Sequence, residues 1–470
     1  MPLALLLATL CGCPALRALV QAPERPRPVL WVDERAIAGG DGSALRPLKQ
    51  VPAELPDRVE LHLLAGLYAG PLALPRGAHL VGHGAAVVFL EGEGVAIDAG
   101  EAALTDVSVQ GGSVGVHARG RVTLERVHFS GHRQAGLLVD REGDVELREG
   151  RFEGPVGSAV GVKVDGGALR GVGLAFRAPF PVAVDCAGGR LDLADLVAEG
   201  PATVLRAVGC RSTVKRASAA GGMREAFLIS GGTADLEHLD VQGHEVALRA
   251  KSAALEVRGL TSRRAQQSGV TLVECTGGLF ELRVEASGSG GALQLLDSNV
   301  TVEDVRVKGV EAMGIFVRQG TVTLRHLDIE GVRADGDALG DGLHLRDARV
   351  TVDDVKVRDV EGSALFAGAL AAVELGHLES VRAAFGALMV ERMAMVRAED
   401  VISSASRSSA VTATDGAQLT LAHLVVRSGG DVPVWAECAQ GVRVQLGQLE
   451  SATAQPPSLC IEPLEAPDAG

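Results

Sequence analysis

The amino-acid sequence predicts an all-β solenoid, a right-handed parallel β-helix, and three observations carry that prediction. The chain of 470 residues is 47% hydrophobic and contains 60 Gly, yet only 3% of it is aromatic. Its apolar content is therefore mainly Val, Leu and Ala, which favours short strands joined by tight turns. Inward and outward residues alternate, as in Val122 and Leu124 followed by Val127 and Phe129. These short stretches also recur at a similar spacing along the chain.

The first apolar residue of each unit defines that period. Fifteen steps lead from Val95 to Pro433 over 338 residues, so one unit takes 338/15, or about 22.5, residues. Helical repeats and propeller blades are longer, and the LxxLxL frame of leucine-rich repeats is absent. Three short strands in about 22 residues fit one coil of a β-helix, and about 16 coils stacked at about 4.8 Å would bury a common core. The aligned residues are Val95, Val116, Leu137, Val162, Val182, Val204, Phe227, Val246, Val270, Ala292, Ile315, Leu343, Ala364, Ala387, Ala410 and Pro433.

The segment 29–94 is expected to hold the N-terminal cap and the first coils, because the end of such a rod exposes unpaired strand edges. A strand at 29–32 precedes a GGDGS turn at 39–43, and residues 45–55 are expected to form a capping helix despite Pro47 and Pro52. The sequence VELHLLAGLYAGPLAL follows. Residues 95–450 are then the regular β-helix, and 451–470 are a C-terminal cap or tail.

This opening resembles that of the pectate-lyase-like β-helix superfamily, in which a GxDGS turn, a cap helix and a GxY strand precede the first regular coil. The resemblance covers about residues 29–455. It implies the fold, and it admits polysaccharide lyases, hydrolases and epimerases among the functions.

The first 13 residues resemble a bacterial lipoprotein signal, although no Lys or Arg precedes the apolar stretch. Leu3 to Leu10 is too short to span a bilayer, and Leu10-Cys11-Gly12-Cys13 is similar to a lipobox. The resemblance implies lipidation of Cys13, with 14–28 as a linker. We expect an exported protein at the outer membrane, in the periplasm or on the cell surface, touching the membrane only through this lipid.

The net charge of −14 excludes nucleic acid as a partner, because an acidic surface repels phosphate backbones. It would also repel a polyanionic polysaccharide unless a local basic strip or a bound cation intervened. The expected partner is an envelope protein or a glycan, and the sequence leaves the oligomeric state open.

Five cysteines follow the lipobox, an odd number. Cys186 and Cys210 are 24 residues apart, and Cys438 and Cys460 are 22 apart, so each pair can lie on neighbouring coils and form a disulfide. The alternative is that they are small buried apolar residues. No CxxC motif occurs, which argues against a structural zinc site.

A column of His and Asp follows one edge of the predicted rod, at the corner between two strands of each coil. We expect these side chains to bond backbone groups of the corner. The alternative, a metal-binding ladder, is disfavoured because coils about 4.8 Å apart do not gather many ligands around one ion. The column comprises Asp195, His238, Asp304, His326, Asp354, His377, Asp400 and His423.

The longest coil, 28 residues from Ile315 to Leu343, contains the loop ADGDALGDG. Asp335, Asp337 and Asp341 could bind Ca²⁺ there, the one cofactor considered. With His344 and Arg346 the same carboxylates could catalyse glycoside hydrolysis. The loop is loosely similar to the Asp-rich signature of polygalacturonase-like hydrolases, but it lacks their Asn-Thr-Asp, Asp-Asp, Gly-His-Gly and Arg-x-Lys set. A third interpretation is a solvated turn that uses Gly and Asp for backbone freedom.

The shortage of aromatic residues bears most directly on function. Clefts that bind carbohydrate usually stack sugar rings on Trp or Tyr, and this chain has only Trp31, Trp435 and Tyr68, all near its ends. We therefore predict a non-catalytic exported protein that presents a binding or structural surface at the bacterial envelope. The alternative is a polysaccharide-active lyase, hydrolase or epimerase with its site near residues 335–346.

Overall fold

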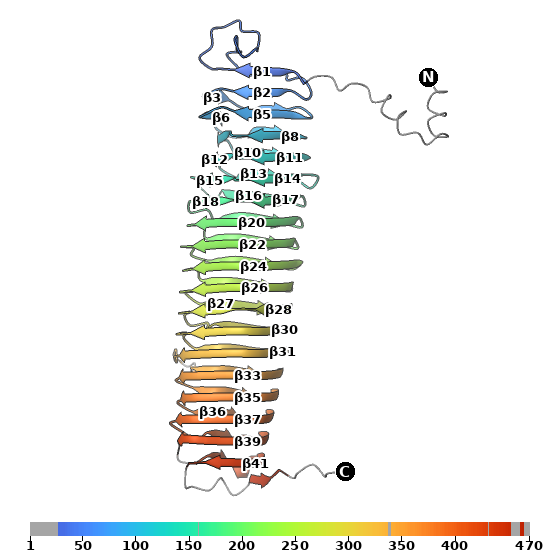
Figure 1. The fold of residues 1–470 in the computed structure, drawn as a ribbon. Coiled ribbons are helices and arrows are strands. Elements are labelled where there is room, and N and C mark those ends of the chain that lie inside the picture. Colours follow the sequence, from blue (N-terminus) through green and yellow to red (C-terminus); the bar gives the residue numbers. More distant parts are fainter. Residues whose placement is uncertain (1–26, 158, 337–339, 431, 453–460, 465–470) are drawn as a thin grey trace, which may run out of the picture.

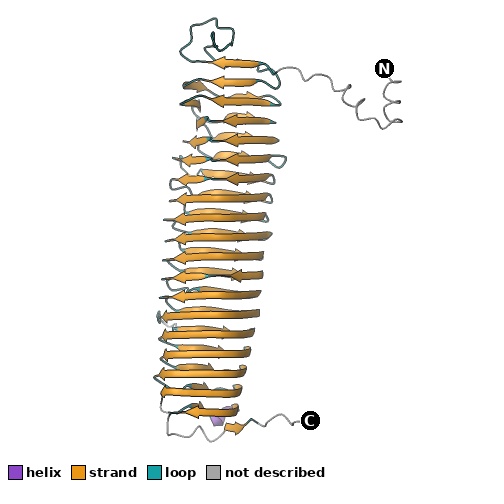
Figure 2. Ribbon diagram, viewed as in Figure 1, coloured by secondary structure: helices purple, strands orange, loops and turns teal. Residues whose placement is uncertain are grey.

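The computed structural model describes residues 27–157, 159–336, 340–430, 432–452 and 461–464. The chain winds into a right-handed parallel β-helix of about 18 turns, which confirms the predicted fold class. The result is a straight rod with strand β1 at one end and β41 at the other (Figure 1). Strands make up nearly all of the regular structure (Figure 2), and the described residues contain one 3-10 turn, η1 (Cys438–Gln440), and no α-helix.

Each turn adds one strand to each of three parallel sheets, and the longer strands bend from one sheet into the next. Sheet 1 contains β1 (Val29–Val32), β2 (Glu60–Leu63), β5 (Ala78–Gly82), β8 (Ala102–Thr105), β11 (Arg121–Glu125), β14 (Asp144–Arg148), β17 (Ala168–Val172), β28 (Thr276–Phe280) and β42 (Ile461–Pro463). Sheet 2 contains β3 (Gly66–Ala69), β6 (Ala86–Leu90), β9 (Ser108–Gly111), β12 (His128–Ser130), β15 (Arg151–Glu153), β18 (Ala175–Arg177) and β29 (Arg283–Glu285).

Sheet 3 completes the triangle of each turn. Its strands are β4 (Leu72–Leu74), β7 (Val95–Ala99), β10 (Val114–Ala118), β13 (Ala135–Val139), β16 (Val160–Asp165), β19 (Val182–Ala187), β21 (Thr203–Val208), β23 (Glu225–Ser230), β25 (Val246–Lys251), β27 (Ser268–Val273), β32 (Asp341–Arg346), β34 (Ser363–Gly368), β36 (Gly386–Val390), β38 (Val411–Ala413) and β40 (Val434–Ala436).

The long strands run through sheets 1 and 2, and β30 and β31 begin in sheet 3. They are β20 (Arg190–Glu199), β22 (Arg211–Ala220), β24 (Thr233–Gln242), β26 (Ala254–Arg263), β30 (Leu293–Lys308), β31 (Met313–Val332), β33 (Arg349–Val360), β35 (Ala372–Ala383), β37 (Met395–Ser406), β39 (Gln418–Gly429) and β41 (Arg443–Ser451).

Register is fixed by the alternation of apolar and polar residues, because a slip by one residue would turn every apolar side chain outward. In β11, Leu124 is buried and pairs with Leu104 in the preceding turn and Leu147 in the following turn. Thr123 between the inward residues points outward. Repeated in every turn, this pattern builds one apolar core that runs from Val32 to Leu446.

Phenylalanines form a column inside that core. Phe129, Phe152 and Phe176 occupy the same position in three successive turns, and their ring centroids are 4.7 and 4.6 Å apart. All three are at most 1% exposed. Stacking at the coil spacing lets each ring contact the next without a change in register.

The predicted capping helix at 45–55 is wrong. Leu48 instead lies extended along the free edge of β1: its N–H donates to the Trp31 carbonyl and its carbonyl accepts from Asp33, both at 2.8 Å. Pro47 and Pro52 each remove a backbone donor that a helix would use, whereas an extended segment at a strand edge tolerates them. The segment therefore still covers the end of the rod, by edge pairing.

Cys13 and the other residues of the predicted signal lie outside the described residues. Among the described residues, no helix has the length and apolar character needed to cross a membrane.

Candidate functional site

One residue of each turn sits at the corner between sheets 1 and 2, and these residues form the corner column. From Asp106 to His326 its non-glycine members have a left-handed backbone, with φ between 51° and 57°. That conformation turns the chain sharply and points the side chain outward. The column comprises Asp106, Arg126, Glu149, Gly173, Asp195, Arg216, His238, Gly259, Glu281, Asp304, His326, Asp354, His377, Asp400 and His423.

Acids and bases in neighbouring turns pair near the N-terminal half of the column. Arg216 donates to both carboxylate oxygens of Asp195 at 2.6 and 2.8 Å, and Arg126 binds Asp106 in the same bidentate way. The hydrogen bond from each guanidinium lowers the pKa of its Asp carboxyl below the ordinary value.

Near the C-terminal end the pairing continues with histidine. Asp400 accepts from His377 at 2.7 Å and from His423 at 2.8 Å, one contact to each carboxylate oxygen. The single column predicted from the His and Asp spacing is therefore confirmed, and these three residues bond one another. Their predicted bonding to the backbone of the corner is replaced by these contacts, because register brings the side chains of adjacent turns within reach.

Between these paired ends the column borders the charged groove, a hollow of about 550 Å³ that spans six turns. Gly259 contributes no side chain at the corner, and the imidazole of His238 lies beside it. The groove is lined by His238, Gly259, Thr261, Glu281, Arg283, Asp304, Val305, Arg306, His326, Leu327, Asp328, Asp354 and Lys356.

Five charged side chains of the charged groove form no ion pair with any described residue: Glu281, Arg283, Arg306, Asp354 and Lys356. This contrasts with the paired ends of the column. For Glu281 and Arg283 the adjacent turns offer no opposite charge in register, because Gly259 and Asp304 flank the first and Thr261 and Arg306 flank the second. The groove therefore has charges of both signs available to a ligand.

Arg283 and Arg306 lie at the centre of the groove, in register on β29 and β30. Two like charges side by side repel each other, and a bound anion would offset that repulsion. Asp328, the next residue in the same row, is engaged by Arg358 at 2.7 Å and does not neutralise them. A smaller hollow of about 200 Å³ shares Arg283, Arg306 and Asp328 and extends the groove over sheet 2 to Lys308.

The chemistry offered by the charged groove is polar throughout. Guanidinium and ammonium groups bind carboxylate, sulfate or phosphate, and free carboxylates accept hydrogen bonds from hydroxyl groups. No Phe, Trp or Tyr is among the described residues that line the groove. Trp31, Tyr68 and Trp435 lie toward the two ends of the rod, as the sequence indicated.

The predicted site in the longest coil is only partly assembled. Asp341 and His344 do meet, at 2.8 Å, but the Asp341 carboxylate is 1% exposed and also accepts the Ser363 N–H at 2.7 Å. His344 packs between the rings of Phe316 and Phe366. Both carboxylate oxygens of Asp341 thus have partners inside the protein. Asp341 therefore stabilises the turn of the chain in which it lies.

The other members of that predicted site are dispersed. Arg346 follows on the outer face of β32, and its Nε has no hydrogen-bond partner among the described residues. Asp335 is exposed in the loop, and Asp337 lies outside the described residues. Among the described residues, no three His, Cys, Asp or Glu side chains are grouped so that they could hold a metal ion.

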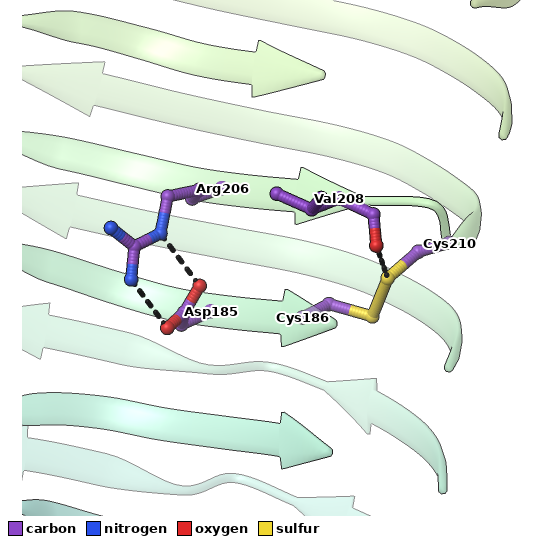
Figure 3. The surroundings of a disulfide bond; sticks show 5 residues. All are labelled: Asp185, Cys186, Arg206, Val208 and Cys210. Carbon is purple, nitrogen blue, oxygen red and sulfur yellow. Dashed lines mark hydrogen bonds and ion pairs between the residues drawn. A yellow bond between two sulfur atoms is a disulfide. The ribbon is translucent and has the colours of Figure 1, made fainter. Parts of the chain in front are cut away.

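One predicted disulfide is present. Cys186 and Cys210 join neighbouring turns of the rod (Figure 3), with 6.5 Å between their Cα atoms. Beside them Arg206 binds Asp185 through two hydrogen bonds, at 2.7 and 2.6 Å.

The remaining cysteines differ in state. Cys438 is disulfide-bonded, and Cys460, its predicted partner, lies outside the described residues. Cys275 is a free, buried thiol whose pKa is raised by burial. The odd number of cysteines had indicated one such residue.

No protein-family model and no curated protein matches the sequence. Three solved structures similar in fold are the catalytic unit of a thermostable alpha-1,3-glucanase from Streptomyces thermodiastaticus, a rhamnogalacturonan lyase, and the A-module of a mannuronan C-5 epimerase from Azotobacter vinelandii. The sequence identities are 10, 10 and 11% and the TM-scores 0.28, 0.17 and 0.16. The alignments cover 86, 86 and 87% of this chain, and 65, 83 and 89% of the respective structures. The chain thus spans about two thirds of the glucanase unit, and the likeness concerns the fold alone.

Proposed function

We propose that this protein is a non-catalytic, exported rod that binds an extended acidic glycan in the charged groove. The observation that supports this is the set of groove charges without an ion-pair partner in the described part of the chain, with Arg283 and Arg306 at its centre. The two guanidinium groups would bind carboxylates of the glycan, and Glu281 and Asp354 would accept hydrogen bonds from its hydroxyl groups.

The overall charge of −14 does not oppose this ligand. The sequence made binding of a polyanion conditional on a local basic strip. Arg283, Arg306 and Lys308 provide such a strip on the adjacent strands β29 and β30, and Lys356 follows two turns further on, beyond Asp328. Because these groups are exposed, their attraction for the ligand is screened by salt, so affinity should fall as ionic strength rises.

The test is calorimetric titration with oligogalacturonate, a chain that carries one carboxylate per sugar. Each charge-assisted contact is worth about 1.5–3 kcal/mol, so the double variant Arg283→Gln, Arg306→Gln should bind at least about tenfold more weakly. The matched control is Arg190→Gln, Arg211→Gln, because these arginines are also in register and exposed but lie outside the groove. Equal affinity of the groove and control variants, or equal binding of an uncharged glucan, would refute the proposal.

A polysaccharide-active enzyme is the second candidate, because the groove holds the carboxylates of Glu281, Asp304 and Asp354 next to basic groups. Paired carboxylates of this kind can act as acid and base on a glycosidic bond. Incubation with oligogalacturonate and analysis of the chain lengths would reveal cleavage, and Glu281→Gln should then abolish it while binding persists. Unchanged chain lengths would support the non-catalytic function.

The proposed setting is the bacterial envelope, with the rod anchored through a lipid on Cys13. Metabolic labelling with a fatty acid should mark the protein, and Cys13→Ser should remove the label. A labelled Cys13→Ser variant would refute the anchor without bearing on the groove.

A further inference from the structure

An exposed apolar patch lies where sheet 3 turns into sheet 1 near the C-terminal end of the rod. Leu370, Met393 and Met395 are 60, 59 and 50% exposed. They come from two successive turns, because Leu370 precedes β35 and Met393 precedes β37, the adjacent strands near the lower end in Figure 1.

Two of these residues occupy a backbone conformation that does not suit them. The turn before β35 has left-handed φ at Ala369 and Leu370 (49° and 65°), and the turn before β37 has it at Arg392 and Met393 (52° and 60°). The next turn of the rod places Asp415 and Gly416 there, the residue types that such a turn favours. Large apolar side chains are thus held in strained turns and presented to solvent, which points to a contact surface.

Two opposite charges beside the patch also lack ion-pair partners among the residues that the structure describes. Glu374 and Arg397 are exposed and in register on β35 and β37, and neither forms an ion pair with a described residue. We propose that this face of sheet 1 binds a second copy of the same chain, with the two rods antiparallel.

The geometry of the sheet makes the face self-complementary. A two-fold axis along the strands, midway between β35 and β37, places β35 of one copy opposite β37 of the other. Residues in register then meet across the axis, so Glu374 faces Arg397 of the partner copy, and this ion pair occurs twice. The two strained turns also face each other, which brings Leu370 against Met393.

The flanking strands fit the same arrangement. The axis places β33 opposite β39, so Arg349 faces Gln418 and Thr351 faces Thr420. None of these pairs juxtaposes like charges. Apolar contact at one edge of the face, two ion pairs beside it and neutral contacts on the flanking strands make the two copies complementary.

The test is sedimentation equilibrium of the purified chain, whose single copy has a mass of 48.4 kDa. The wild type should form a dimer. Glu374→Arg or Arg397→Glu alone should raise the dimer Kd at least about tenfold, because each places like charges opposite twice, and the two together should restore it. The control is Arg190→Glu, an exposed position on β20, which should leave the mass unchanged.

Met393→Gly separates loss of contact from loss of fold. Glycine relieves the left-handed turn, so the melting temperature of the monomer should not fall, whereas the dimer should weaken. A single-copy mass at every concentration, or a dimer that none of these changes weakens, would overturn the proposal. Failure of the double charge reversal to restore the dimer would overturn the antiparallel two-fold arrangement.

Discussion

Buried His132 should make the stability of its turn depend on pH. It lies between β12 and β13, is 4% exposed and packs edge-on against Phe129 at 6.2 Å. Its Nδ1 donates to the Gly111 carbonyl, whereas Nε2 is buried and has no hydrogen-bond partner. Burial lowers the pKa of His132 from 6.5 to about 4, because the charged ring would lose its hydration and its hydrogen bonding to the backbone offsets only part of that loss.

The size of the effect follows from that shift. A lowering by about 2.5 pKa units at about 1.36 kcal/mol per unit amounts to about 3 kcal/mol. The unfolded chain binds the proton near pH 6.5, and the folded chain binds it only near pH 4. This contribution is therefore fully present above pH 6.5 and is lost as the pH falls from about 6.5 to about 4.

Hydrogen exchange of the β12 and β13 amides at a series of pH values, corrected for intrinsic exchange, measures this loss locally, which suits a rod whose turns contact only their neighbours. His132→Gln keeps a donor for the Gly111 carbonyl but cannot be protonated. The free energy of opening measured at these amides should thus fall less between pH 7 and pH 4 in the variant than in the wild type. The difference should reach about 3 kcal/mol. Exposed His238→Gln serves as the control and should retain the wild-type slope. If His132→Gln also retained that slope, the buried neutral ring would not be the cause.

Three further changes test the core, the disulfide and the buried carboxylate. Phe152→Ala removes the middle ring of the aromatic column and should cost about 3–5 kcal/mol in denaturant unfolding. Replacing both Cys186 and Cys210 by Ala removes a link across 24 residues and should cost about 3 kcal/mol, seen as a lower midpoint that reductant changes less than it changes the wild-type midpoint. Asp341→Asn weakens the bonds to Ser363 and His344 and should cost about 1–3 kcal/mol, measured in the same way.

Each of these changes has a control in the chain. Phe385 is 46% exposed, so Phe385→Ala should alter stability far less than Phe152→Ala. Cys275 is free, so Cys275→Ala should leave the response to reductant unchanged. Equal effects of target and control would show that burial or the disulfide is not responsible, and a neutral Asp341→Asn would show that this carboxylate does not stabilise its turn.

The fold was predictable because every turn repeats the same constraint. A residue such as Leu124 contacts its equivalents in the turns before and after it, so the apolar alternation recurs once per turn and is visible in the sequence. The capping segment carries no such repetition. A helix was expected there, but Pro47 and the free edge of β1 favour the extended pairing of Leu48.

The candidate site was less predictable, because its residues are adjacent only across turns. Arg283, Arg306 and Lys356 look like ordinary outward residues of separate strands in the sequence. The unusually long coil drew attention to Asp341 and His344, which do meet, yet burial assigns Asp341 to the closure of a turn. The sequence did contain one signal for the groove. Arg283 and Arg306 occupy the same position in successive repeats, and Gly259 replaces a side chain in the corner column nearby.

Periodicity also explains how a binding surface can be recognised on a rod of this kind. The repeat places outward side chains of neighbouring turns about 4.8 Å apart, so opposite charges pair wherever nothing prevents it, as Asp195 does with Arg216. A stretch in which charges of both signs stay unpaired therefore differs from the rest of the surface. Stability gains little from exposed ion pairs, and leaving them unformed costs the fold little. Selection for ligand binding can therefore change the charges around Arg283 and Arg306 without weakening the core beneath them.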